Sequence, residues 1–118
     1  MVIILVKPIL SISLSIFSKE EFSRVIEARL TRLDPLSREG RLMHRFYFSG
    51  AVEAVPDRQG RVMVPQALLQ SAGLEREVIV VGVFDHLEVW DRAAWRGYMK
   101  QVEENVEDAA ELLAAQHD

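Results

Sequence analysis

The stretch from Ala51 to Val81 decides the fold, and it reads AVEAVPDRQGRVMVPQALLQSAGLEREVIVV. The segments from Ala51 to Val55 and from Arg61 to Val64 are rich in valine and are separated by turn residues, which predicts two short strands. The connection between them is Pro56-Asp57-Arg58-Gln59-Gly60. Asp accepts hydrogen bonds from the backbone that follows it, and Gly adopts positive φ readily, so this segment is typical of a tight turn. The sequence therefore predicts a strand, a turn and a return strand.

Downstream of this hairpin the signals change to those of a short helix and a buried strand. Pro65 is suited to a first helical turn, and Gly73 is suited to a helix end. The run Val78-Ile79-Val80-Val81 is β-branched throughout, as in a buried strand. We expect a helix between Pro65 and Gly73 and then a strand.

The chain contains an internal repeat. Val2–Val6 resembles Val78–Val81, and Leu14–Phe17 resembles Leu87–Trp90 at an offset of 73 residues. Each second strand runs into an amphipathic helix with an apolar stripe at helical spacing. The two stripes share the same offset, and they are Phe22, Val25, Ile26 and Leu33, then Trp95, Tyr98, Met99 and Val106.

Each of these two helices has a start signal. Ser18 with Glu21 predicts a capping box, in which a hydroxyl and a carboxylate satisfy two backbone amides. Asp91 is the matching cap in the second copy. The aromatic side chains on these faces could stack on bases, but their positions favour core packing or a subunit interface.

The apolar start of the chain is interpreted as strand, with an export signal as the minor alternative. Lys7 and Pro8 interrupt the run early, which argues against a signal peptide or a membrane span. Leu10, Ile12, Leu14 and Ile16 then alternate with Ser11, Ser13 and Ser15. This period predicts a strand with one buried face and a polar serine face.

We expect four regions along the chain. Residues 1–33 form a partial first repeat of two strands and a helix, and residues 34–50 form a linking helix that Gly50 ends. Pro35 in the first turn or Ser37 as a cap begins that helix. Residues 51–103 form a complete second repeat, and residues 104–118 form an acidic tail that either continues as helix or frays.

The totals describe one soluble globular domain of 118 residues with a formal net charge of −4. Cysteine is absent, which excludes disulfides, thiolate metal sites and a cysteine nucleophile. The charge is unevenly spread. Residues 24–61 hold eight arginines and five acids, whereas residues 62–118 hold four basic and eleven acidic residues. A basic middle and an acidic end suit an anionic partner and a solvated tail, although an uneven surface alone would look the same.

An enzyme is not expected. His44, His86 and His117 are far apart and lack metal-ligand spacing with acidic partners. Asp85 and His86 stand where two strands connect, so a turn role is expected for them. The serines lie on a strand, and the glycines form no phosphate-binding pattern. No cofactor, metal or small-molecule substrate is expected.

Arg58 and Arg61 are the candidate contacts to an anion. Both sit on or beside the tip of the predicted hairpin, where a planar guanidinium could donate paired hydrogen bonds to phosphate or to a guanine edge. An ordinary hairpin with solvated arginines is the alternative. We expect Asp57–Arg61 to form an exposed turn near other basic groups, and burial of Arg61 in an ion pair would contradict a role in binding.

The combined pattern from Phe46 to Met99 resembles the second half of MraZ proteins, which have AbrB-type swapped-hairpin modules. The decisive segments are FYFSGAVEAVPDRQGRVMVPQALLQSAGLEREVIVVGV and LEVWDRAAW, and the resemblance extends upstream to about Val2. It implies an α+β fold, an AbrB-like swapped-hairpin β-barrel built from a tandem repeat. The first copy is expected to lack its own hairpin and short helix, with the absent strands missing or supplied by a neighbour.

The resemblance also implies a function. Such proteins bind G-rich direct repeats upstream of the division and cell-wall gene cluster and regulate its transcription. The expected partners are double-stranded DNA and further copies of the chain in a ring, in the cytoplasm at the nucleoid, without a membrane. Carried over, Arg61 contacts DNA while Asp57, Gln59 and Gly60 shape the turn; Arg58 stands at a variable position. The alternative is an oligomerisation module that no longer binds DNA.

Overall fold

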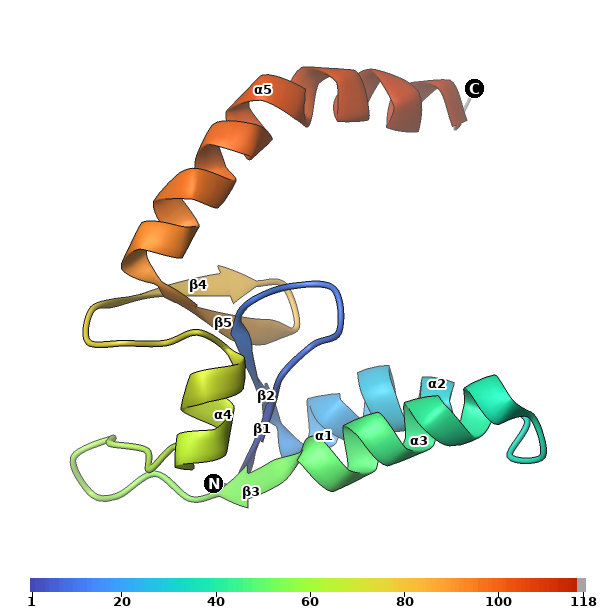
Figure 1. Ribbon diagram of the computed structural model, residues 1–118, viewed down its shortest axis with the longest axis vertical. Coiled ribbons are helices and arrows are strands. Elements are labelled where there is room, and N and C mark those ends of the chain that lie inside the picture. Colours follow the sequence, from blue (N-terminus) through green and yellow to red (C-terminus); the bar gives the residue numbers. More distant parts are fainter. Residues whose placement is uncertain (117–118) are drawn as a thin grey trace.

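The computed structural model describes residues 1–116 and shows a mixed α+β fold built around one five-stranded antiparallel sheet (Figure 1). The strand order is β3-β1-β2-β5-β4. The strands are β1 (Ile3–Val6), β2 (Leu14–Ser18), β3 (Val52–Ala54), β4 (Val78–Val83) and β5 (His86–Asp91). The helices are α1 (Lys19–Phe22), the π-helical turn η1 (Ser23–Glu27), α2 (Ala28–Leu30), α3 (Arg38–Gly50), α4 (Gln66–Ser71) and α5 (Arg92–Gln116).

Strand β1 is the most deeply buried element. All four of its residues are apolar and buried, and Leu5 is fully inaccessible. Because successive side chains of a strand point to opposite faces, Ile3 and Leu5 lie on one face while Ile4 and Val6 lie on the other. A strand without a polar residue therefore needs cover on both faces of the sheet.

Helix α4 covers one face. Leu68 and Ala72 of α4 are buried together with Ile3, Leu5 and Leu14. The prediction of a short helix between Pro65 and Gly73 is confirmed. Its end is formed by the Leu74 amide, which donates to the Leu69 carbonyl, and by Gly73 at φ +66°.

The helices that follow β2 cover the other face. Phe17 and Phe22 are buried with Ile4 and Val6, and Val25, Ile26, Tyr47 and Ala51 pack around them. The segment from α1 through α2 lies beside α3 (Figure 1). The helix predicted after Ser18 is present, but it includes the π-helical turn and ends at Leu30, before Leu33.

The strand predicted from Leu10 onward is wrong in its first half. Leu10 is 97% exposed and Ile12 is 61% exposed, and β2 begins only at Leu14. The polar serine face is also wrong, because Ser13 and Ser15 are buried. Strand β2 is paired on both edges, by β1 and β5, and its residues Leu14 and Phe17 belong to the two separate buried clusters of the core, so both of its faces carry packing.

The buried and half-buried serines have local partners. The hydroxyls of Ser11 and Ser13 are 2.6 Å apart. The ammonium of Lys7 donates to the carbonyls of Pro8 (2.7 Å) and Ser11 (3.1 Å). These bonds hold residues 7–13 as a compact loop, which explains why the alternating pattern does not extend the strand.

The predicted helix starts are largely confirmed. The Glu21 amide donates to Ser18 Oγ (3.1 Å), but the Glu21 carboxylate pairs with Arg24, so only half of the predicted capping box forms. The Ala94 amide donates to Asp91 Oδ2 (3.4 Å). In α3 the cap is Ser37, whose hydroxyl accepts from the Gly40 amide (3.0 Å).

Helix α3 therefore begins after Asp34-Pro35. The close approach of the chain at Gly40 explains why the helix starts at this point. The Asp34 carbonyl lies directly over Gly40, where a Cβ would come within 2.1 Å of its oxygen. Only glycine permits this close approach. The preceding residues turn instead of continuing the helix, and Ser37 rather than Pro35 begins it.

The second half of the chain adds the hairpin β4–β5 and the long helix α5. Strand β5 pairs with β2, with Leu14 opposite Val89, and it pairs with β4, with Ile79 opposite Trp90. The Trp90 ring stacks on Tyr98 at 4.9 Å, which fastens the first turns of α5 to the sheet. From there α5 projects away from the sheet and continues as helix to Gln116 (Figure 1).

The predicted return strand Arg61–Val64 does not form. Strand β3 pairs with β1 instead, with Val52 opposite Leu5, and the return segment has no ladder. Val62 and Val64 nevertheless pack against the core while Met63 is 87% exposed, so successive side chains still alternate between core and solvent. Within residues 1–116 the sheet is open, with β3 and β4 at its edges.

No helix in the part of the chain that the structure describes is long and apolar enough to cross a membrane.

The burial of β1 gives a stability prediction. Leu5→Ala should lower the free energy of unfolding by about 2–5 kcal/mol, because the lost methyl groups leave a cavity in a core closed on both sides. Leu36→Ala, at an 84% exposed position, should change it by less than about 0.5 kcal/mol. Urea unfolding followed by circular dichroism measures both values. Similar losses in the two variants would contradict this account of the core.

Candidate nucleic-acid interface

The turn Asp57–Arg61 stands on an exposed loop between β3 and α4. Val55, just beyond the end of β3, is 67% exposed, and every residue from Asp57 to Arg61 is exposed. Figure 1 shows this loop projecting beyond β3 and α4. Its return side is tied to the core through Val62 and Val64. The tip is thus solvent-facing but carried on a packed base.

Asp57 organises the turn. Its Oδ1 accepts hydrogen bonds from the amides of Gln59 (2.9 Å) and Arg61 (2.8 Å). The Asp57 amide donates to the Arg61 carbonyl (2.9 Å), and the Gly60 amide donates to the Asp57 carbonyl (3.0 Å). Gly60 adopts φ +80°, a conformation that glycine accepts without strain. The turn is therefore closed by side-chain and backbone bonds in the absence of a ladder.

One guanidinium nitrogen of Arg61 is hydrogen-bonded within the turn, and the other two face solvent. Its Nε donates to Asp57 Oδ2 (2.9 Å), and its side chain remains 74% exposed. In residues 1–116 no acceptor lies on its two terminal amino groups. The ion pair that forms is thus an exposed one, unlike the buried pair that would contradict a binding role. It orients the guanidinium and leaves the planar fork to solvent.

The other two residues of the tip have lesser roles. The Gln59 side chain is exposed, and only its backbone amide takes part in the turn. Arg58 is exposed and makes no hydrogen bond or ion pair within the described chain. The structure thus brings Asp57, Gln59, Gly60 and Arg61 into one bonded unit and leaves Arg58 beside it.

The bonds at Asp57 lower the pKa of its carboxyl below the ordinary value. The largest cause is the hydrogen bond from the Arg61 backbone amide. Burial raises the pKa and opposes this effect in part. The hydrogen bonds from the Arg61 side chain and from the Gln59 backbone amide lower the pKa further. All three hydrogen bonds favour the ionised carboxylate. The turn is therefore built for a charged Asp57.

A second polar cluster lies at the β4–β5 turn, where the sequence predicted only a connection. His86 Nδ1 lies 2.7 Å from Asp85 Oδ1, and His86 Nε2 lies 3.3 Å from Glu88 Oε2. The Trp90 indole donates to Glu88 Oε1 (3.0 Å). The hydrogen bond with His86 lowers the pKa of Asp85. The available signal was the spacing of residues 86, 88 and 90, which places them on one face of a strand.

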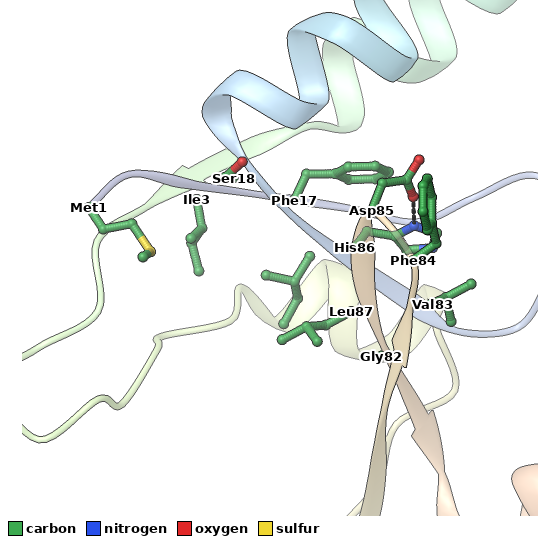
Figure 2. A pocket seen from close by; sticks show the side chains of 11 residues that line it. Met1, Ile3, Phe17, Ser18, Gly82, Val83, Phe84, Asp85, His86 and Leu87 are labelled. Carbon is green, nitrogen blue, oxygen red and sulfur yellow. Dashed lines mark hydrogen bonds and ion pairs between the residues drawn. The ribbon is translucent and has the colours of Figure 1, made fainter.

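The cluster borders an apolar cleft of about 330 Å³ between the start of β1, β2 and the β4–β5 turn. Figure 2 shows Phe17 beside His86, with Ile3 and Met1 farther along the same cleft. The rings of Phe17 and His86 stack at 4.7 Å. Both His86 nitrogens are engaged by carboxylates, so the ring acts as a link between strand and turn and not as an open base.

The remaining histidines do not join this cluster. His44 on α3 bonds through Nε2 to the Leu30 carbonyl and so links α2 with α3. His117 lies outside the described residues. Among residues 1–116 no three histidine, aspartate or glutamate side chains form a group that could hold a metal ion.

Comparison with known families identifies relatives of this sequence. Residues 47–116 match the family described as "MraZ protein, putative antitoxin-like". The matched segment contains the Asp57–Arg61 turn, helix α4, the hairpin β4–β5 and helix α5.

Curated relatives agree with this match, and three proteins named transcriptional regulator MraZ illustrate it. The protein of Acetivibrio thermocellus is 40% identical over 98 residues, covering 83% of this chain and 68% of the relative. That of Kocuria rhizophila is 45% identical over 91 residues (76% and 62%), and that of Halothermothrix orenii is 37% identical over 100 residues (85% and 69%). The chain spans about two thirds of the length of these relatives.

The lowered pKa of Asp57 gives a prediction for pH. Because its pKa is depressed in the folded chain, the carboxylate stabilises the turn above the ordinary Asp range, and this contribution is lost as the pH falls through the lowered value. The side-chain carboxyl ¹³C shift of Asp57 should titrate below the ordinary range of an aspartate. Amide exchange at Gln59 and Arg61 should accelerate in Asp57→Asn. Titration of Asp57 within the ordinary aspartate range would contradict the bonded turn.

Proposed function

The chain belongs to the MraZ family, and we propose that it is a DNA-binding transcriptional regulator whose Asp57–Arg61 turn contacts DNA. The main support for this proposal is the exposed guanidinium of Arg61. Asp57 orients it through Nε, and its two terminal nitrogens remain available to a ligand. The relatives' name, transcriptional regulator, supports DNA as the partner.

The geometry of Arg61 suits either a phosphate or a guanine edge. Its two terminal amino groups can donate parallel hydrogen bonds to two acceptors, as on a phosphate or on O6 and N7 of guanine. Nε stays on Asp57, so contact with DNA does not require the turn to open. Arg58 adds a second positive charge, and its side chain forms no bond within the turn. The tip is net positive although the whole chain has a net charge of −4.

The proposed target is a set of short G-rich direct repeats upstream of the division and cell-wall gene cluster. A single turn per chain makes few contacts and should bind weakly. Several copies assembled in a ring would offer several turns to spaced repeats, and the effective concentration of each further turn would then be high. We place this activity in the cytoplasm at the nucleoid.

The domain organisation is part of the same proposal. The regions 1–33, 34–50, 51–103 and 104–118 act as a partial repeat, a link, a full swapped-hairpin repeat and an acidic tail. The hairpins β1–β2 and β4–β5 correspond in the proposed repeat. Within residues 1–116, β1 pairs with β3 on the edge away from β2, whereas β4 has no partner on the edge away from β5. A closed barrel would require a strand at β4 that comes from outside the described chain.

An interaction module without DNA binding is the second candidate. It is favoured by the acidic total and by helix α5, whose apolar side chains Val106, Leu112 and Leu113 are exposed. Such a chain would keep its self-association and show no preference among duplexes. The titration below separates the two functions.

We expect the chain to prefer a fluorescent duplex with several G-rich direct repeats over a scrambled duplex. Arg61→Ala should weaken binding by roughly 1–3 kcal/mol if it reads guanine, or reduce the log–log salt slope by about 0.9 if it contacts one phosphate. Anisotropy titrations at several salt concentrations measure both quantities.

Arg76→Ala is the matched control, since Arg76 is an exposed arginine on the loop before β4. It should leave affinity and slope nearly unchanged. Equal binding of the two duplexes at every salt concentration would reject sequence-specific reading and favour the interaction module.

A further inference from the structure

Helix α3 carries three exposed arginines that have no part in the Asp57–Arg61 turn. They are Arg38, Arg41 and Arg45. Within residues 1–116 none of them forms an ion pair, and Arg41 donates only to a backbone carbonyl, that of Leu36 (2.7 Å). Three uncompensated positive charges on one helix, in a chain of net charge −4, favour an anionic partner at this helix.

The three arginines form one stripe along α3. At about 100° per residue, Arg41 and Arg45 lie within roughly 60° of Arg38 around the helix axis. Tyr47, which packs against the core, lies roughly 120–180° away from all three. The acidic residue of α3, Glu39, lies roughly 100–160° away from them. The stripe therefore faces solvent and contains no carboxylate.

The region around the stripe is basic as a whole. Residues 28–50 contain five arginines and two acidic residues. The two arginines outside α3 are Arg29 on α2 and Arg32 just after it, and both are exposed. Helix α2 contacts α3, so their charges lie at the same end of the molecule as the stripe. The basic middle of the sequence is thus gathered on one helical unit.

The length of the stripe suits a polyanion. Seven residues separate Arg38 from Arg45, which at about 1.5 Å per residue gives roughly 10 Å along the helix axis. One strand of duplex DNA carries a phosphate about every 3.4 Å of its axis, so the stripe matches about three phosphates. A planar guanidinium can donate two hydrogen bonds to each of them.

The stripe also lies within reach of a duplex held at the turn. Helix α3 leads into β3 and then into the loop of the turn, and Figure 1 shows the three in one row along one edge of the molecule. Following the chain, Arg45 lies within roughly 30 Å of Asp57, given the rise per residue of a helix and of a strand. One helical turn of DNA is about 34 Å long.

We propose that the α3 stripe binds the phosphates of duplex DNA that flanks the site contacted by the Asp57–Arg61 turn. The inference rests on the proposed DNA binding and adds a second surface with a different task. Phosphates are the same in every sequence, so the stripe contributes affinity and orientation, whereas selection among sequences stays with the turn. The charge of the basic middle then acts on DNA although the whole chain is acidic.

The test is an anisotropy titration of the full chain on the G-rich and the scrambled duplex at several salt concentrations. The stripe variant combines Arg38→Gln, Arg41→Gln and Arg45→Gln, since glutamine removes the charge and retains helix propensity. It should bind both duplexes more weakly by the same factor, roughly tenfold or more. For each bound chain, the log–log salt slope should fall by about 2–3, because three phosphate contacts are lost.

A matched control separates the stripe from the effect of net charge. Arg76→Gln with Arg96→Gln and Lys100→Gln also removes three exposed positive charges, from the loop before β4 and the first turns of α5. This variant should shift affinity less than about threefold. Circular dichroism verifies that both variants are folded. A control as impaired as the stripe variant would overturn the proposal.

The length of the DNA tests the position of the contact. A duplex with one G-rich repeat and about ten further base pairs on each side, one helical turn, should bind the wild type more tightly than a duplex trimmed to the repeat. The gain should be roughly tenfold for the wild type and less than about threefold for the stripe variant. Equal gains in the two proteins would contradict a contact on the flanks.

The stripe and the turn can fail separately. Equal binding of both duplexes by the wild type, lost in the stripe variant, would reject sequence reading by the turn and retain the stripe. A stripe variant that binds like the wild type would overturn the stripe, while a preference that Arg61→Ala abolishes would retain the turn. The exposed Leu42 (49%) and Phe46 (42%) beside the stripe would then indicate a protein partner for α3. A wild type that binds neither duplex would overturn both.

Discussion

The two-sided burial of β1 is the constraint on which the rest of the structure depends. Four consecutive apolar residues, Ile3–Val6, require cover from α4 on one face and from the helices after β2 on the other. Since α4 follows the Asp57–Arg61 turn directly, the layer that shields Leu5 also carries the candidate interface. Burial of each large apolar side chain contributes roughly 1.5–3 kcal/mol, far more than an exposed ion pair. Hydrophobic packing thus positions a turn whose own bonds are weak.

The Asp57–Arg61 turn has a fixed backbone and still leaves the Arg61 guanidinium exposed to a ligand. Asp57 binds two amides and one guanidinium nitrogen, so it shapes the backbone and aims Arg61 at the same time. An arginine that is half engaged loses less conformational entropy when a ligand arrives than one that moves freely. The neighbouring carboxylate also reduces the attraction to phosphate, so the geometry favours directed hydrogen bonds over charge alone.

Much of this arrangement could be predicted from the sequence, and the failures have local causes. Strands β1, β3, β4 and β5, the caps at Ser18 and Asp91, the helix closed by Gly73 and the turn at Asp57 follow from side-chain chemistry that acts within a few residues. The burial of Ser13 and the start of β2 at Leu14 depend on Lys7 closing a loop and on β5 pairing from far along the chain. The side chains of Arg61–Val64 alternate between core and solvent as in a strand, but β3 pairs with β1 and not with this segment. Pairing between distant segments is not encoded in local periodicity.

The uneven charge is the last feature that needs a physical account. A chain of net charge −4 is repelled by DNA at long range, so a DNA-binding tip works best where acidic side chains are distant or neutralised. Helix α5 extends away from the sheet, which removes its carboxylates from the turn by length alone (Figure 1).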